Sequence, residues 1–303
     1  MAVETSSTVT GEMMTFYESK FLERSKELLV HQEGLQKSTR PNNQGKANVF
    51  NRYTQLANAT TPLTEGANPS EVALTATQVT VTLAEYGNLI KISKLLKLTS
   101  IDKDAKEKVE LLGQNMGETL DQLTRDALTT GATVSYAGSK TTLTDVGSTN
   151  TLSATEIRRI RRKLIQNKAM KYSNGMFMGK IGPDTEFDLI GDSVWQNAHS
   201  YKDGDALYKG YLGNLYGFDF ALSTQAKSEA STTTVYSNIF HGMNAAGVYD
   251  LSQDVPQLYI KVPGPSDTSN ALNRFSTIGW GGTFAAKVLV AAWVLNWKSG
   301  ASS

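Results

Sequence analysis

The sequence predicts an α+β protein in which strands from both ends of the chain flank a central insert. Two features lead to this prediction, a very long amphipathic helix over 103–129 and a long strand hairpin over 47–84. A third is the most apolar stretch of the chain, Ile278–Trp297, near the C-terminus. At 303 residues, the chain is long enough for two domains of ordinary size.

Composition excludes several classes of function. Lysine and arginine total 30 against 29 for aspartate and glutamate, so no bulk charge attracts nucleic acid or acidic lipid. Cysteine is absent, which excludes disulfides, thiolate metal sites and cysteine nucleophiles. The N-terminal residues lack the apolar core of a secretory signal, so we expect a soluble protein made in a cytoplasm.

The N-terminal part is predicted to form a helix over Glu12–Glu33 that ends at Gly34. Apolar residues recur in it at spacings of three, four and seven, as they do on one face of a helix. They are Met14, Tyr17, Phe21 and Leu28. The polar stretch 36–46 follows and is expected to be extended or mobile.

Two strand-like segments come next, Ala47–Leu56 and Leu74–Ala84. The 17 residues between them contain two prolines and a glycine, and a structureless loop of that length is uncommon inside a compact domain. An isolated two-stranded hairpin is also marginally stable in water. We therefore expect this hairpin to rest on another surface. A flexible surface hairpin in a monomer is the alternative.

The strongest predicted helix is Lys103–Thr129, roughly 40 Å long at 1.5 Å per residue. One apolar stripe runs along it. The stripe consists of Val109, Leu112, Met116, Leu120, Leu123 and Ala127. Gly113 and Gly117 lie one turn apart inside this helix, where each costs about 1 kcal/mol relative to alanine. Either another backbone crosses closely at these glycines, or they are merely tolerated.

A Ser/Thr/Gly-rich connection, Gly131–Leu152, indicates a domain boundary before a mixed segment of helices and strands. Ser153 and Glu156 have the spacing of a capping box, which predicts a helix up to Asn167. The other predicted elements are a strand at Met176–Gly182, a short helix beginning at Pro183, and strands at Phe218–Ser223, Thr234–Gly242 and Ala246–Leu251.

The apolar stretch near the C-terminus is not predicted to enter a membrane. Lys287 divides it into two uncharged runs, and each is shorter than the about 20 residues that a spanning helix needs. Its residues are apolar on both faces of an extended chain, which is typical of strands that are covered on both sides. We predict two strands, Arg274–Val288 and Ala292–Lys298, with a turn near Val290.

The sequence contains no recognisable catalytic motif. It lacks a phosphate-binding loop, a nucleophile elbow and EF-hand spacing, and its three histidines are scattered. We therefore predict no catalytic residue, no cofactor and no metal. Asp184, Glu186 and Asp188 could supply the acid and base of a hydrolase. However, acids at a helix N-terminus also stabilise the helix dipole, which is their more ordinary role.

One basic cluster lies on the outward faces of the helix that Ser153 opens. Its residues are Arg158, Arg159, Arg161, Arg162 and Lys163. The cluster could contact DNA phosphates weakly, lie at a subunit interface, or form a solvated face, which the sequence alone favours.

The order of elements resembles that of the major capsid proteins of tailed bacteriophages, which have the Hong Kong 97-type fold. Six segments are similar to the branch named after coliphage N-four, and the resemblance covers roughly Phe16–Trp297. The segments are "ATTPLTEGANPSE", "IKISKLLKLTSID", "LLGQNMGETLDQLTRDAL", "IGPDTEFDL", "LGNLYGFDF" and "RFSTIGWGGTFAAKVLVAAWVL".

The resemblance implies five segments: an N-terminal arm with a helix (1–45), an extended loop (46–92), a first part of the peripheral domain with a spine helix (93–151), an axial domain (152–251), and a second part of the peripheral domain made of returning strands (252–303). It implies that the tip of the extended loop reaches a neighbouring subunit. The tip residues are Thr61, Pro62, Leu63, Thr64, Glu65 and Gly66.

By this resemblance, the chain is a structural major capsid protein and not an enzyme. Its copies would form the hexamers and pentamers of an icosahedral virion shell around double-stranded DNA, assembled in the host cytoplasm. The implied partners are a portal protein, a cement or decoration protein, and packaged DNA held without sequence specificity. We also expect a separate scaffolding protein, because little chain precedes the extended loop to hold a fused one. An encapsulin-like compartment is the alternative with the same fold.

The founding member of this fold joins a lysine of the extended loop to an asparagine of a neighbouring subunit. In this chain the loop tip, Ala57–Ala73, contains no lysine, and cysteine is absent. We therefore expect a shell held together by non-covalent contacts alone.

Overall fold

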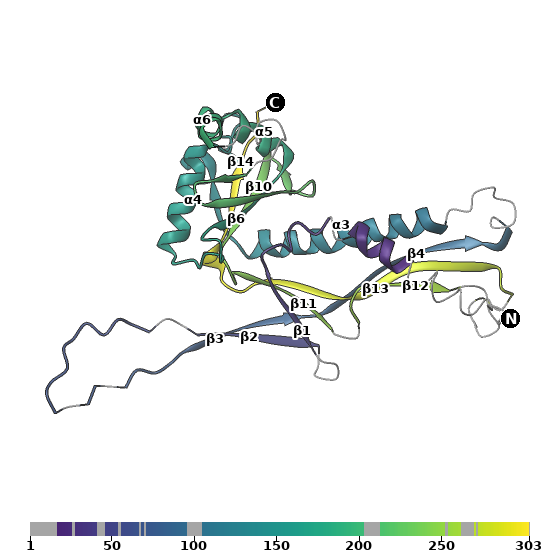
Figure 1. The fold of residues 1–303 in the computed structure, drawn as a ribbon, viewed down its shortest axis with the longest axis horizontal. Helices are drawn as coiled ribbons and strands as arrows, with labels where there is room; N and C mark the ends of the chain where they lie inside the picture. Colours follow the sequence, from purple (N-terminus) through teal and green to yellow (C-terminus); the bar gives the residue numbers. More distant parts are fainter. Residues whose placement is uncertain are drawn as a thin grey trace.

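The protein has a long, flat lower unit that ends in a thin hairpin, and an upper unit that rises from the middle of it (Figure 1). The computed structural model describes residues 17–25, 28–40, 46–53, 56–66, 68–69, 71–95, 105–202, 213–251, 254–261, 270 and 272–302. Helices and strands are mixed in both units, so the predicted α+β class is confirmed.

The lower unit is built on a five-stranded sheet against which the long helix α3 (Ala105–Gly131) packs. The strands are β1 (Gln36–Arg40), β11 (Ala246–Leu251), β13 (Phe275–Val288) and β12 (Gln257–Lys261) in that order, with β4 (Ala84–Ser93) paired to β13. Buried apolar side chains of α3 and β13 share one core. At its edge, the indole N–H of Trp280 donates to the Asn115 side chain over 3.0 Å, which ties the sheet to the helix.

The predicted long helix and its apolar stripe are confirmed. Val109, Leu112, Met116 and Leu120 are buried, and the last two stripe positions are half-buried. A Cβ atom at Gly113 would lie 2.7 Å from the carbonyl oxygen of Phe21. The two glycines therefore exist because a second backbone, the helix of residues 17–25, crosses α3 there.

The N-terminal helix is shorter than predicted. Residues 17–25 are helical, residues 12–16 lie outside the described part of the chain, and residues 28–35 form turns. The backbone N–H of His31 donates to Asp121 over 2.6 Å, and its carbonyl oxygen accepts from Lys180. Because both backbone groups of His31 bind side chains, they cannot take part in helical hydrogen bonds.

The upper unit contains a seven-stranded sheet covered by three helices. Its strand order is β5 (Thr133–Tyr136), β14 (Val294–Ser299), β10 (Thr234–His241), β6 (Phe177–Ile181), β8 (Phe218–Leu222) and β7 (Asn214–Leu215), with β9 (Ser228–Ala230) paired to β10. The helices are α4 (Ala154–Gln166), α5 (Pro183–Gly191) and α6 (Ser193–Lys202). Ser153 caps α4 as predicted, and Ile157, Ile160 and Leu164 are fully buried.

Two predicted strands are in a different sheet from the one we expected. β13 lies beside α3, but β14 pairs with β10 and β5 in the upper sheet instead of returning to the lower one. Conversely, β11 pairs with β1 and β13 in the lower sheet, although it falls within the segment expected to be axial. The chain changes sheets through a short 3-10 helix, Ala291–Trp293, after the predicted turn near Val290.

Buried polar side chains join the two units and the N-terminal segment. The Nδ1 atom of His31 lies 2.7 Å from a carboxylate oxygen of Asp121 on α3. Lys180 of β6 reaches the carbonyl oxygen of His31 with its amino group and is 1% exposed. Burial lowers the pKa of Lys180 to about 7, although the charges of Asp121 and Glu33 act in the opposite direction.

A second set of buried polar contacts holds the end of the same segment. The hydroxyl of Tyr172 donates to the carbonyl oxygen of Gly34 over 2.7 Å and lies 2.9 Å from Nδ1 of His241. Burial lowers the pKa of His241 well below its ordinary value. Residues 31–34 are thus fixed between α3 and the upper sheet at both ends.

Replacing Gly113 with alanine should destabilise the subunit by about 1–3 kcal/mol, because the new methyl group overlaps the backbone at Phe21. Denaturant unfolding of the unassembled subunit measures this change. Gly191→Ala is the matched control, because nothing lies within 4 Å of the new methyl group. Intrinsic helix propensity should make the control neutral or slightly stabilising. A stabilised Gly113→Ala variant would contradict the close crossing.

Lys180 should make the free energy of unfolding rise with pH. The pKa of Lys180 is about 7 in the folded chain against an ordinary 10.5, so the unfolded chain binds more protons between these values. Urea unfolding of the unassembled subunit between pH 7 and pH 10 should show this rise. Lys180→Met should flatten it, whereas Lys140→Met, at an exposed position, should leave it intact. An unchanged slope in Lys180→Met would contradict this assignment.

Candidate functional site

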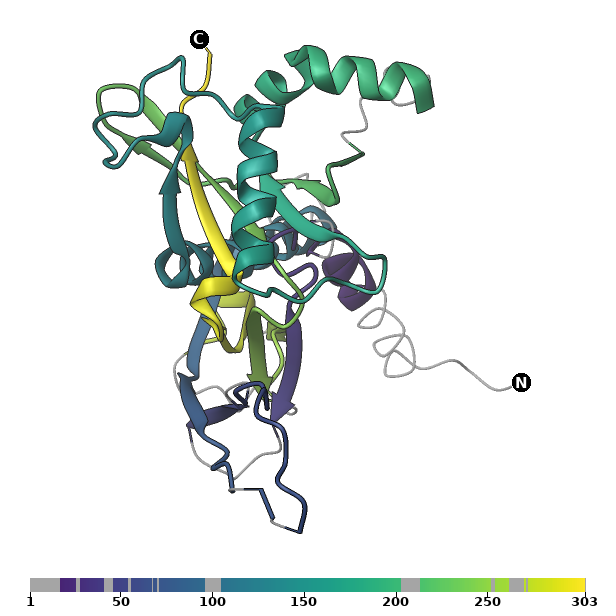
Figure 2. The ribbon, with the colours of Figure 1, turned by 90° about the vertical axis from the view of Figure 1, so that its left-hand side faces the viewer.

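The hairpin is anchored at its base and projects away from both units (Figures 1 and 2). As predicted, two antiparallel strands form it, β2 (Ala47–Tyr53) and β3 (Ala76–Thr82). Val81 and Leu83 are buried beside the five-stranded sheet. The ring of Phe50 meets that of Tyr249 edge-on, with ring centroids 5.9 Å apart. These contacts fix the direction in which the hairpin leaves the lower unit.

The tip of the hairpin is not covered by any part of the chain that the structure describes. Every described residue between 56 and 78 is exposed, including all six predicted tip residues, Thr61 to Gly66. Exposed apolar side chains follow one another along it. They are Leu56, Leu63, Val72 and Leu74, of which Leu63 is 70% exposed. A run of apolar side chains in water favours burial against another molecule.

The charges of the tip all have one sign. Between Ala57 and Ala73, Glu65 and Glu71 are the only charged residues in the sequence. The tip therefore combines an apolar row with two carboxylates and presents no amine.

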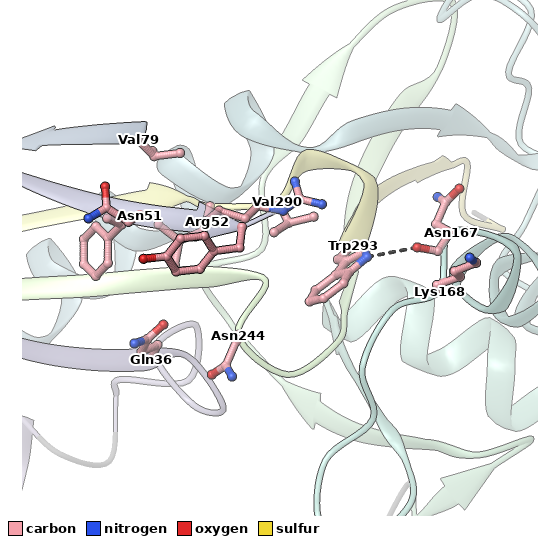
Figure 3. A pocket seen from close by; sticks show the side chains of 12 residues that line it. Gln36, Asn51, Arg52, Val79, Asn167, Lys168, Asn244, Val290 and Trp293 are labelled. Carbon is pink, nitrogen blue, oxygen red and sulfur yellow. Dashed lines mark hydrogen bonds between the residues drawn. The ribbon is translucent and has the colours of Figure 1, made fainter. Parts of the chain in front are cut away.

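A pocket of about 480 Å³ lies where the hairpin base meets the upper unit (Figure 3). The guanidinium of Arg52 lies over the ring of Trp293, 5.7 Å from its centroid. The indole N–H of Trp293 donates to the carbonyl oxygen of Asn167 over 2.9 Å. Trp293, which lies between the two sheets, thus connects the hairpin to the end of α4. The orientation of the hairpin therefore depends on both units.

The structure divides the predicted basic cluster on α4 into two groups. Arg159 pairs with Glu156 over 2.6 Å, and Lys163 donates to the hydroxyl of Ser135 over 2.8 Å. Arg161 lies half-buried against the β7–β8 turn at Gly217. Arg158 and Arg162 are exposed, but the guanidinium of Arg158 also lies over the ring of Tyr216, 5.9 Å from its centroid. Most of the expected positive surface is therefore used inside the chain.

The three acids that could serve a hydrolase have different partners and surroundings. Asp184 accepts a hydrogen bond from the Tyr236 hydroxyl, which raises the pKa of that tyrosine. Asp188 accepts from the backbone N–H of Ser302 over 3.1 Å and from its hydroxyl. Glu186, whose pKa is raised by burial, is two residues from each and faces another side of the helix. The hydrogen bonds of Asp184 and Asp188 thus tie each carboxylate to another part of the chain and not to a second acid.

The described residues contain neither a metal-binding group nor a membrane-spanning helix. Within that part of the chain, no group of three histidine or acidic side chains could hold a metal ion. None of the helices that the structure describes is both long and apolar enough to cross a bilayer.

Sequence reasoning missed one exposed aromatic residue. Phe187 of α5 is 73% exposed, whereas Thr185 and Leu189 of the same helix are fully buried. The signal was available: with 185 and 189 on the inner face, position 187 must point outward.

Comparisons with known proteins agree on one fold. No protein-family model and no curated protein matches the sequence. Among solved structures, the capsid of Ralstonia phage GP4 is similar, with a TM-score of 0.68, 14% identity, and 89% of this chain and 87% of that chain covered. The capsid of cyanophage P-SCSP1u has a TM-score of 0.67 and 12% identity, covering 89% and 88%. The capsid of cyanophage Pam1 has a TM-score of 0.65 and 17% identity, covering 88% and 89%. The chain therefore has the Hong Kong 97-like fold of phage capsid proteins.

Proposed function

We propose that the chain is a structural subunit of a phage capsid, whose copies form hexamers and pentamers of an icosahedral shell around double-stranded DNA. The observation that carries this proposal is the likeness to phage capsid proteins over nearly the whole of both chains. The exposed hairpin supports it, because its apolar tip has no partner among the described residues of its own chain. In this role the tip, Thr61 to Gly66, is covered by a neighbouring subunit.

We extend the proposal to location and partners. The subunit would be assembled in the host cytoplasm, with a separate scaffolding protein and a portal protein, and would reside in the virion capsid. A cement protein would add contacts between subunits. The resemblance to the N-four-like branch and the five segments given above belong to the same proposal.

Contact with packaged DNA should be weak and without sequence specificity. Four of the five basic residues on α4 have contacts inside the chain, as described above. The overall charge of +1 adds no general attraction to phosphate.

Production of the subunit, alone and together with the scaffolding protein of the same phage, tests the proposed function. Negative-stain microscopy should show closed shells of uniform size. A subunit that remains monomeric under both conditions would refute the proposal. Mature particles that contain protein cargo rather than DNA would instead identify an encapsulin-like compartment.

Changing Leu63 and Val72 of the hairpin tip to aspartate should reduce the yield of shells by at least about tenfold. Burial of each apolar side chain contributes about 1.5–3 kcal/mol, and the added carboxylates would have to be buried as well. Sedimentation of assembly reactions measures the yield. Thr64→Ser, at an equally exposed tip position, is the control and should assemble normally. Normal yields from the double aspartate variant would show that the tip is not part of a contact.

Mature particles boiled in SDS should give one subunit band near 32.9 kDa. The reason is that the tip presents no amine and the chain no thiol, so covalent links through these groups cannot form. Intact-mass spectrometry of the same particles provides an independent check. Bands of pentamers and hexamers that survive boiling would contradict a purely non-covalent shell.

A further inference from the structure

The outward face of α4 carries a basic and apolar stripe. Ile157, Ile160 and Leu164 point into the core, so the opposite side of the helix faces away from the sheet. This outward side presents three exposed residues that follow one another at spacings of four and three: Arg158, Arg162 and Ile165. Ile165, in the last turn of the helix, is 51% exposed. We call these three residues the α4 stripe.

The outward face of α5 carries the opposite combination. Phe187 is 73% exposed, and Asp184, one turn earlier, is also exposed. The helix cannot rotate to hide the ring, because Thr185 and Leu189 are fully buried on its inner side. We call Asp184 and Phe187 the α5 pair.

The two surfaces complement each other chemically. A guanidinium forms paired hydrogen bonds with a carboxylate and also stacks on an aromatic face. Arginine and aromatic residues are enriched in the centres of protein interfaces. The α4 stripe offers an aliphatic side chain and two guanidinium groups, of which that of Arg158 also lies over the ring of Tyr216 in its own chain. The α5 pair offers a ring and a carboxylate that also accepts from the Tyr236 hydroxyl and keeps further acceptor sites.

We propose that the α4 stripe of one subunit binds the α5 pair of the next, as the head-to-tail contact between upper units. This inference rests on the proposed function, because it supplies a contact from which rings can be built. α4 stands along one side of the upper unit, and α5 lies across its top (Figures 1 and 2). A contact between two different faces is heterologous, and such contacts close into rings when the rotation permits.

A second copy fits these observations better than DNA does. DNA would use Arg158 and Arg162 but would leave Ile165 and Phe187 in water. One chain carries both halves of the contact, with opposite charges, and its net charge of +1 causes little repulsion between copies.

A charge exchange tests the contact. Arg162→Asp and Asp184→Arg should each lower the yield of capsomers and shells at least about tenfold, since each places like charges in contact. The double variant should restore most of the yield, because the charge pair is re-formed in reverse. Lys140→Asp, which makes the same charge change at another exposed position, should assemble normally.

The absence of cysteine permits a second, independent measurement. Ile165→Cys combined with Phe187→Cys should give, after mild oxidation of assembled particles, SDS bands up to pentamers and hexamers that reducing agent removes. Each single variant, and the pair Ile165→Cys with Leu111→Cys on the exposed side of α3, should not give that series.

The outcomes separate this inference from the proposed function. If the unchanged chain forms no shells under any condition, the proposed function fails. If it forms shells and the two single charge variants do so equally well, or the double variant is no better than either, the contact is wrong. Normal shells that hold less DNA in Arg162→Asp would also overturn the contact and would assign the α4 stripe to DNA.

Discussion

The buried contact between Asp121, His31 and Lys180 is the interaction on which the arrangement of the molecule depends. These residues come from the long helix, the N-terminal segment and the upper sheet, so one cluster joins three parts that are distant in sequence. Charges in such a site are costly unless each is hydrogen-bonded or paired. Loss of any one member would leave the others buried without compensation. The cluster therefore specifies one relative position of the two units.

The two glycines of α3 belong to the same arrangement. The N-terminal segment first crosses the helix at Gly113 and Gly117 and then turns, so that His31 reaches Asp121 one turn further along α3. A side chain at either glycine would push the crossing segment away and displace the backbone groups that bind Lys180. The close crossing at the glycines and the buried contacts of His31 therefore act together. They fix the N-terminal segment on α3 and connect α3 to the upper unit through Lys180.

A rigid interior contrasts with an outer surface that is incomplete in a single copy. Buried contacts fix the base of the hairpin, but apolar side chains are exposed along its tip. The upper unit presents a basic stripe on one helix and an exposed phenylalanine beside a carboxylate on another. Such exposed surfaces are what the proposed assembly of copies would bury. The near-zero net charge of the chain suits dense packing of many copies.

Local pattern was sufficient for many of the elements. The apolar stripe of α3, the cap at Ser153, Pro183 at the start of α5 and the alternation in β3 were each readable, because each depends on neighbours within a few residues. The hairpin also followed from the sequence, since two strand-like segments flank a long loop that contains two prolines and a glycine. The resemblance to capsid proteins named the fold, and the structural likenesses agree with it.

Tertiary structure decided what depends on partners distant in the chain. No pattern in "QKSTR" distinguishes a loop from β1, which exists because β11 offers it a parallel edge. Strands β13 and β14 are both apolar on two faces, so only the positions of the two cores decide that they enter different sheets. The first helix does not continue through residue 31 as predicted, because buried side chains bind the backbone groups of His31. Of the five basic residues on α4, the fold decided which remain free for another molecule. The sequence by itself determined most of the helices and strands. Long-range packing determined how they pair and which surfaces they expose.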